Sequence, residues 1–203
     1  MTDPVPHVSG VAAPLIRPNI DTDQIIPSRE MKSVGKTGLA DGLFAGWRYT
    51  APGTRDPDPD FVLNRPGFAH APILLGGRNF GCGSSREHAV WALHEYGVRA
   101  VIASSFAPIF RGNCVRNGII PVVLPPDAVE AIAGEGAPVT IDLVAQTVAC
   151  GPLSYSFEID PSAKAMLAEG LDAIDLTFKH RSEIAAFQAR DRTARPWVYL
   201  EDS

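Results

Sequence analysis

The residues best suited to chemistry gather in one glycine-rich stretch, which reads Gly76-Gly-Arg-Asn-Phe-Gly-Cys-Gly-Ser-Ser-Arg-Glu-His88. A short buried strand is expected just before it, at Ile73–Leu75, and a helix just after it, from Arg86 to Tyr96. Free backbone N–H groups and the helix dipole favour an anion at such a helix start. A cation there opposes the dipole, so the position of Arg86 indicates a binding role, such as holding a carboxylate.

Two interpretations of Ser84 remain open on local grounds. Ser84 and Glu87 fit a capping box, in which the serine caps the helix and the glutamate reaches back. Alternatively Ser84 is a catalytic hydroxyl, because three glycines around one cap exceed what capping requires and let a ligand approach the backbone. The stretch matches neither the dinucleotide fingerprint nor a phosphate loop. A serine nucleophile usually needs a histidine, but His88 is more simply a surface residue, and the Gly-x-Ser-x-Gly elbow is missing.

Two other groups of residues could do chemistry. Asp21 and Asp23 could serve as ligands or as acid and base, although turn formation and helix capping explain them more simply. The cysteines are Cys82, Cys114 and Cys150, and no Cys-x-x-Cys occurs among them. We therefore expect neither a disulfide framework nor a metal or cluster held by this chain alone.

Alternating strands and helices surround the glycine-rich stretch. A strand at 98–103, a helix at 106–117 and a strand at 119–124 predict βαβ units with parallel pairing. Beyond them, antiparallel strands are expected at 139–143, 147–150 and 154–159. Helices are then expected at 161–169, 172–178 and 182–189. We predict one α/β domain over residues 1–190 with a long loop at about 31–68, and a C-terminal tail at 191–203.

The bulk composition limits the function classes. The chain has 203 residues, of which 45% are hydrophobic and 20% are charged, and its net charge is −5. This charge argues against nucleic-acid binding, but it leaves room for an anionic ligand at a local site. No apolar run is long enough to cross a membrane, and the start of the chain does not look like a signal peptide. A reducing, cytoplasmic location fits the few scattered cysteines.

The segment Gly81–His88 resembles the small subunits of isopropylmalate dehydratase and, more distantly, the swivel domain of aconitase. The resemblance extends over roughly residues 7 to 190, so chance is a poor explanation for it. The other segments that match are Asn19–Pro27, Gly42–Tyr49, Pro59–Asn64, Ser105–Asn113, Asn117–Pro121, Phe157–Asp160 and Gly170–Ile174.

This resemblance implies a swivelling β/β/α domain with a mixed sheet and flanking helices. It also implies a large partner subunit that holds a [4Fe-4S] cluster, and a small dicarboxylate substrate. Together the two subunits would interconvert 2-isopropylmalate and 3-isopropylmalate through isopropylmaleate, a step of leucine biosynthesis. A related malate, such as methylmalate or homocitrate, is an alternative substrate, because only the loop at 31–48 would differ.

The resemblance to aconitase also implies roles for single residues. Ser84 would act as the base, as an alkoxide, and Arg86 would hold a substrate carboxylate. Ser85 would add a hydrogen bond, and Asp23 falls where the aconitase pattern has an active-site aspartate. The loop at Met31–Gly38 would line the pocket for the isopropyl group. Lys32 or Lys36 would meet the second carboxylate, with the choice between them open. A non-enzymatic anion-binding module and a serine hydrolase are the remaining hypotheses.

Overall fold

The computed structural model describes residues 3–31 and 35–199. It contains two four-stranded sheets, one entirely parallel in the order β2-β3-β4-β5 and one entirely antiparallel in the order β1-β6-β7-β8. The parallel strands are β2 (Ala12–Leu15), β3 (Ile73–Gly76), β4 (Ala100–Ala103) and β5 (Ile120–Val123). The antiparallel strands are β1 (His7–Gly10), β6 (Val139–Asp142), β7 (Thr147–Cys150) and β8 (Leu153–Ser156).

One N-terminal segment, at residues 7–15, serves both sheets. Its first part, β1, pairs with β6, and its second part, β2, pairs with β3. The two outer strands of the parallel sheet, β2 and β5, each contain a proline, Pro14 and Pro121. Proline has no N–H to donate and is therefore tolerated at a sheet edge.

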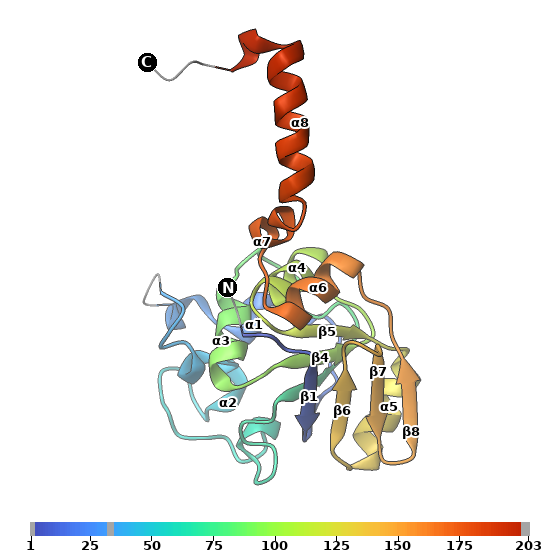
Figure 1. Cartoon of the computed structure of the whole chain (residues 1–203). Helices are drawn as coiled ribbons and strands as arrows, with labels where there is room; N and C mark the ends of the chain where they lie inside the picture. Colours follow the sequence, from blue (N-terminus) through green and yellow to red (C-terminus); the bar gives the residue numbers. More distant parts are fainter. Residues whose placement is uncertain (1–2, 32–34, 200–203) are drawn as a thin grey trace.

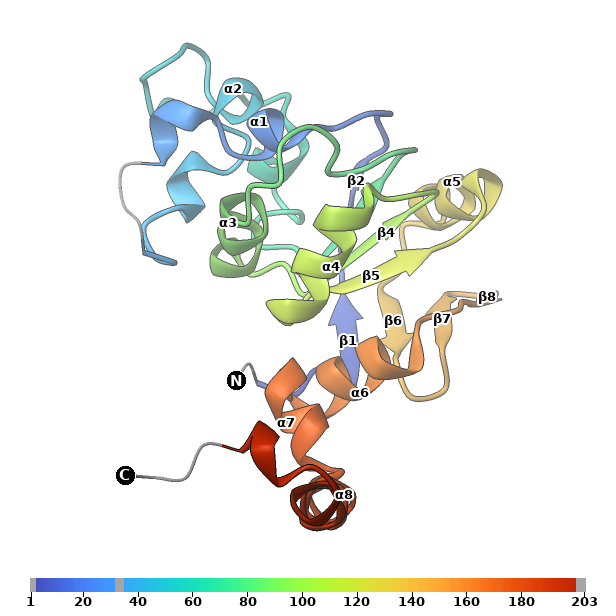
Figure 2. The same ribbon diagram turned by 90° about the horizontal axis from the view of Figure 1, so that it is seen from above.

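The parallel sheet forms the middle layer of the molecule (Figure 2). Leu74 and Val101 face a core shared with the helices. Their neighbours in sequence, Ile73, Leu75 and Ile102, face a second core shared with the antiparallel sheet. Both faces are therefore covered, as expected for parallel strands. The predicted β/β/α architecture is confirmed, and the parallel and antiparallel pairings occupy separate sheets.

Helices flank the parallel sheet (Figures 1 and 2), whereas the outer face of the antiparallel sheet is exposed at Ser9, Thr140 and Ala149. The first core joins the parallel sheet to α1 and α3, and α5 contacts β2, β3 and β4. The helices of this body are α1 (Thr22–Ile25), α2 (Ala45–Arg48), α3 (His88–Tyr96), α4 (Pro108–Arg116), α5 (Pro126–Glu135) and α6 (Pro161–Glu169).

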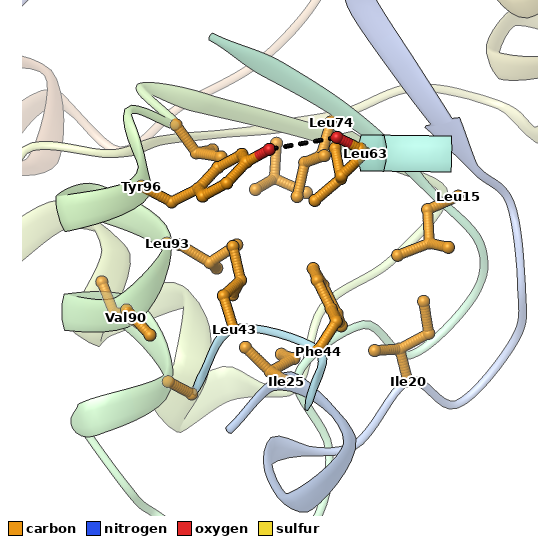
Figure 3. Close-up of a cluster of buried hydrophobic side chains, with 14 of the residues drawn as sticks. Leu15, Ile20, Ile25, Leu43, Phe44, Leu63, Leu74, Val90, Leu93 and Tyr96 are labelled. Atoms are coloured by element: carbon orange, nitrogen blue, oxygen red, sulfur yellow. Dashed lines mark hydrogen bonds between the residues drawn. The ribbon is translucent and has the colours of Figure 1, made fainter. Parts of the chain in front are cut away.

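The region that we predicted as a long loop contributes strongly to the first core. It contains the short helices η2 (Ala40–Gly42), α2 and η3 (Val62–Asn64). Its buried apolar side chains include Leu39, Leu43, Phe44, Phe61, Val62 and Leu63. Figure 3 shows Leu43, Phe44 and Leu63 packed among side chains of α1 and α3, where the Tyr96 hydroxyl donates to the Leu63 carbonyl at 3.3 Å. The weak hydrophobic periodicity of this region therefore did not reveal that its side chains pack in the core.

The chain ends in a segment that we call the C-terminal arm: α7 (Ala173–Phe178), α8 (Arg181–Ala194) and η4 (Pro196–Val198). Neither α7 nor α8 has a buried residue, and α8 projects away from the body (Figure 1). We expected this last helix to end near Ala189, but it continues to Ala194. In the described ranges, no helix combines the length and the apolarity needed to cross a lipid bilayer.

Candidate active site

Three connections meet at the carboxyl ends of neighbouring parallel strands. They follow β2, β3 and β4, and they contain the Asp21–Asp23 segment, the glycine-rich stretch and the segment that begins at Ser104. The carboxyl ends of parallel strands are where α/β folds usually place ligand sites, because their loops converge there. The predicted chemical residues thus come from adjacent loops at one edge of the sheet.

Backbone hydrogen bonds hold the glycine-rich stretch between the other two connections. The Gly81 N–H donates to the Ile20 carbonyl at 2.7 Å, and the Thr22 N–H donates to the Cys82 carbonyl at 2.9 Å. On the other side, the Phe80 N–H donates to the Ser105 carbonyl at 2.9 Å. These bonds extend the parallel order of the strands beyond the sheet, so the turn that follows has a fixed position.

Two glycines of this turn have a structural purpose. Gly81 and Gly83 have φ angles of +76° and +90°, which side chains rarely tolerate. A Cβ atom at Gly81 would also lie 2.0 Å from the Phe110 ring. We expected these glycines to admit a ligand to the backbone, but backbone conformation and packing already explain them.

The capping interpretation of Ser84 is wrong. Helix α3 begins at His88, and Glu87 is the residue at its cap position. The Glu87 carboxylate does not reach back to Ser84 but accepts a hydrogen bond from the Asn117 side chain at 2.6 Å. Arg86 likewise lies before the helix, not in its first turn. Ser84 is therefore not required for the helix end.

Arg86 and Asp23, which lie 63 residues apart in sequence, form an ion pair through Arg86 Nη1 and Asp23 Oδ1. The Asp23 carboxylate also accepts from the Ser28 hydroxyl at 3.2 Å. The side chains of Arg86 and Asp23 remain 27% and 56% exposed. Because Nη1 uses only part of the five N–H donors of a guanidinium, Arg86 can still receive a second carboxylate.

The two serines lie on the solvent side of the same turn. Ser84 and Ser85 are exposed, and the Thr22 hydroxyl donates to the Ser84 carbonyl at 3.1 Å, which fixes the Ser84 backbone. Within the described ranges neither serine hydroxyl has a hydrogen-bond partner. The His88 ring packs on Trp91 with a centroid distance of 4.6 Å. No dyad between Ser84 and His88 forms, which removes the main support for a hydrolase.

The remaining candidates are Asp21 and the three cysteines, and the structure places them in a helix cap, in the core and in the glycine-rich turn. Asp21 caps α1, where its side chain accepts from the Gln24 N–H at 2.7 Å, so the capping interpretation is confirmed for Asp21. Cys114 and Cys150 are buried, and burial raises the pKa of both thiols. Cys82 is half-buried beside Gly81 and Gly83.

Two contacts that the sequence did not indicate fasten the 35–40 segment to α3. The Glu95 carboxylate accepts from the backbone N–H groups of Gly38, Leu39 and Ala40 at 2.6, 2.6 and 2.9 Å. Partial burial alone would raise the pKa of Glu95, but these three donors outweigh it and lower the pKa below 4.5. Because the donors are backbone groups, no residue pattern could have revealed this contact.

The second contact involves Lys36, whose ammonium donates to the Asn117 side chain at 3.3 Å and lies 5.3 Å from the centre of the Trp91 ring. Lys36 is exposed, and in the described part of the chain it has no carboxylate partner. Lys32, the other lysine that we considered, lies outside the described residues. Asn117 precedes Gly118, and this pair indicated only the end of a helix.

Three family models match parts of the chain. Residues 2–127 match the family model for the aconitase C-terminal domain, and residues 128–161 match a model described as LeuD_N. Residues 174–199 match the model for the C-terminal domain of the 3-isopropylmalate dehydratase small subunit. The aconitase match therefore contains all four predicted site residues, whereas the C-terminal arm matches a model specific to small subunits.

The chain also has close full-length relatives. It is 57% identical to the 3-isopropylmalate dehydratase small subunit of Cupriavidus necator, over 95% of this chain and 96% of that one. It is 48% identical to the small subunit from Paramagnetospirillum magneticum, over 94% and 97%. The crystal structure of 3-isopropylmalate dehydratase from Methanocaldococcus jannaschii superposes with a TM-score of 0.66 at 30% identity, covering 90% of this chain and 99% of that one. The chain therefore belongs to the family of 3-isopropylmalate dehydratase small subunits.

Proposed function

We propose that this chain works with a large subunit to interconvert 2-isopropylmalate and 3-isopropylmalate through isopropylmaleate in leucine biosynthesis. One observation carries the proposal: an exposed serine and an ion-paired arginine share one fixed turn. The chain that contains this turn aligns with 3-isopropylmalate dehydratase small subunits over almost their whole length. The open position of this turn supports the view that it is one side of an active site that a second protein completes.

Ser84 acts as the base in this proposal. Dehydration removes a proton from one carbon and a hydroxide from its neighbour, and rehydration in the opposite sense gives the isomer. Serine is a weak acid, so an alkoxide at Ser84 needs nearby positive charge. Arg86, two residues away, supplies a full charge, and the start of α3 adds the partial charge of a helix N-terminus.

Arg86 and its neighbours bind the substrate. The planar guanidinium suits a substrate carboxylate, and the Asp23 carboxylate limits the directions in which Arg86 can point. The exposed hydroxyl of Ser85 adds a hydrogen bond. Lys36 meets the second carboxylate, because it is an exposed cation without a carboxylate partner in the described ranges. Met31 and the segment from Gly35 to Gly38 line the pocket for the isopropyl group, and residues 32–34 of that loop lie outside the described residues.

The [4Fe-4S] cluster belongs to the large subunit in this proposal, where it supplies a Lewis acid for the departing hydroxide. Two of the three thiols of this chain do not suit a cluster, because Cys114 and Cys150 are buried with raised pKa values. Within the described ranges, no three histidine, cysteine or acidic side chains are grouped to hold a metal. Free thiols are also typical of a reducing compartment, so we place the protein in the cytoplasm.

Reconstitution with a cluster-bearing large subunit tests the proposal. The two chains are co-purified without oxygen and assayed with isopropylmaleate, citraconate and other substituted maleates by the loss of ultraviolet absorbance. We expect hydration only when both chains are present, with isopropylmaleate as the best substrate. Preference for citraconate would assign the chain to a related malate enzyme. Absence of turnover on every substrate would overturn the proposal.

A further inference from the structure

The side chain of Asn117 uses all of its hydrogen-bonding capacity in the protein interior. Asn117 is only 5% exposed and ends helix α4. Its Oδ1 accepts from Trp91 Nε1 at 3.1 Å and from Lys36 Nζ at 3.3 Å. Its Nδ2 donates to Glu87 Oε1 at 2.6 Å and to the Asn113 carbonyl at 2.9 Å. Two donors and two acceptor positions are all that a carboxamide offers.

The partners of Asn117 come from elements that lead to the candidate site. Glu87 directly follows Arg86 and stands at the cap position of α3, and Trp91 lies one turn further along that helix. Lys36 comes from the segment that Glu95 fastens to the other end of α3. One buried amide therefore connects an exposed ammonium to the residue next to Arg86.

Helix termination alone does not explain this arrangement. The backbone N–H of Asn117 already bonds to the Asn113 and Cys114 carbonyls at 3.1 Å each, which ends α4 without the side chain. Burying a carboxamide is unfavourable unless its groups are all bonded, and here all four positions of the Asn117 amide are used. The amide also has a particular chemical advantage here: it orients the Lys36 ammonium without neutralising its charge, whereas a carboxylate would neutralise Lys36 and repel Glu87.

We propose that Asn117 is a positioning residue that holds the Lys36 ammonium beside the Ser84–Arg86 turn, where Lys36 meets the second carboxylate of a dicarboxylate substrate. Asn117 itself does not touch the substrate. This inference rests on the proposed function, because it assigns to Lys36 a carboxylate of the same substrate that Arg86 binds.

A double-mutant cycle in the reconstituted complex tests the coupling between the two residues. We expect Lys36→Met and Asn117→Ala each to raise KM by about tenfold, with kcat within about threefold of wild type. Because both changes remove the same contact, the double variant should raise KM no further than the stronger single variant. Additive increases, or a KM that stays at the wild-type value in Lys36→Met, would overturn the proposal.

Asn113→Ala is the matched control. Asn113 is also buried on α4, but its side chain accepts only from Arg116, and its carbonyl remains when the side chain is removed. A purely structural role for Asn117 predicts that Asn113→Ala and Asn117→Ala both lower the melting temperature and that neither changes KM. Our proposal predicts a raised KM for Asn117→Ala alone.

Asn117→Asp covers the case in which Asn117→Ala does not fold. The new side chain has the same shape and keeps both acceptor contacts, but its carboxylate neutralises Lys36 and repels Glu87. We expect a raised KM and a lower melting temperature, because the new carboxylate faces Glu87 Oε1 and the Asn113 carbonyl. Lys36→Met, at an exposed residue, tests the effect on KM if neither Asn117 variant folds. An unchanged KM contradicts the inference while the wild-type complex is active. An inactive wild-type complex instead counts against the proposed function, and with it against this inference.

Discussion

The Ser84–Arg86 turn and the C-terminal arm are both exposed, but they differ in what lies behind them. The turn is held by backbone bonds to Ile20 and Thr22 and by the ion pair to Asp23. The arm exposes large apolar side chains, including Ile174 at 64% and Trp197 at 77%, and its helices have no buried residue. Exposure alone therefore does not identify a catalytic surface. The turn differs from the arm in having fixed support from several elements, which a catalytic surface needs because catalysis requires precise placement.

Different family models match the turn and the arm. The aconitase model covers the turn and its supports, and the small-subunit model covers the arm. If the turn is catalytic and the arm is not, changes at the turn affect turnover and substrate binding with little effect on stability. Changes to the arm should leave the body intact.

Of the changes that test the difference between the turn and the arm, Ser84→Ala should have the largest effect on the enzyme. We expect turnover of the reconstituted enzyme to fall by roughly 10²–10⁴-fold, because the base is lost. Ser84 is exposed and does not cap α3, so the free energy of unfolding should change by less than about 0.5 kcal/mol. Steady-state kinetics and urea unfolding measure the two quantities. Normal turnover in a folded variant would remove Ser84 from the mechanism.

Arg86→Lys should have the next largest effect. An ammonium keeps the charge but cannot form the planar, two-point contact with a carboxylate. We expect KM to rise by about 10- to 100-fold, with a smaller change in kcat. Initial-rate measurements over a range of substrate concentrations separate the two constants. Equal KM values for variant and wild type would contradict the assignment of Arg86 to a carboxylate.

Glu95→Gln should loosen the 38–40 segment, because the amide has one accepting oxygen where the carboxylate has two, and its NH2 group cannot accept the N–H bonds made to the other. We expect a loss of about 1 kcal/mol in local stability, measured by hydrogen exchange of the amides of Gly38, Leu39 and Ala40.

Acid should have the same effect on the wild type. The pKa of Glu95 is lower in the folded chain, so its contribution is complete above the unfolded value and is lost as pH falls through the folded value, below pH 4.5. Glu130→Gln, at an exposed glutamate of α5, is the control and should change neither result. Exchange in wild type that is independent of pH after correction for intrinsic rates would exclude the role of Glu95.

Removal of residues 180–203 should have the smallest effect. This change deletes α8 and η4, and α8 has no buried residue. We expect the free energy of unfolding to change by less than about 1 kcal/mol, with the sheets intact by circular dichroism. A loss of unfolding free energy several times larger would show that the arm supports the body. The contrast between a supported turn and an independent arm would then fail.

The sequence predicted most of the parallel sheet because its strands are short apolar runs bounded by glycine. It also predicted Ser84, Arg86 and Asp23 as site residues, which stays a prediction, although only the fold could bring Asp23 to Arg86. It failed at the start of α3, because Ser84 and Glu87 fit a local capping pattern that tertiary contacts override: Glu87 binds Asn117 instead. Likewise, the buried side chains between Leu39 and Leu63 follow no regular period, since they pack from irregular backbone.

The shared N-terminal segment has a consequence for how the chain folds as it is made. Strand β2 can pair with β3 once residues up to Gly76 have been synthesised. Its neighbour β1 must wait for β6, because His7 pairs with Asp142, and closing so long a loop slows folding. During translation, therefore, the half that bears the site can assemble early, while the opening strand keeps an unpaired edge until the last third of the protein emerges from the ribosome.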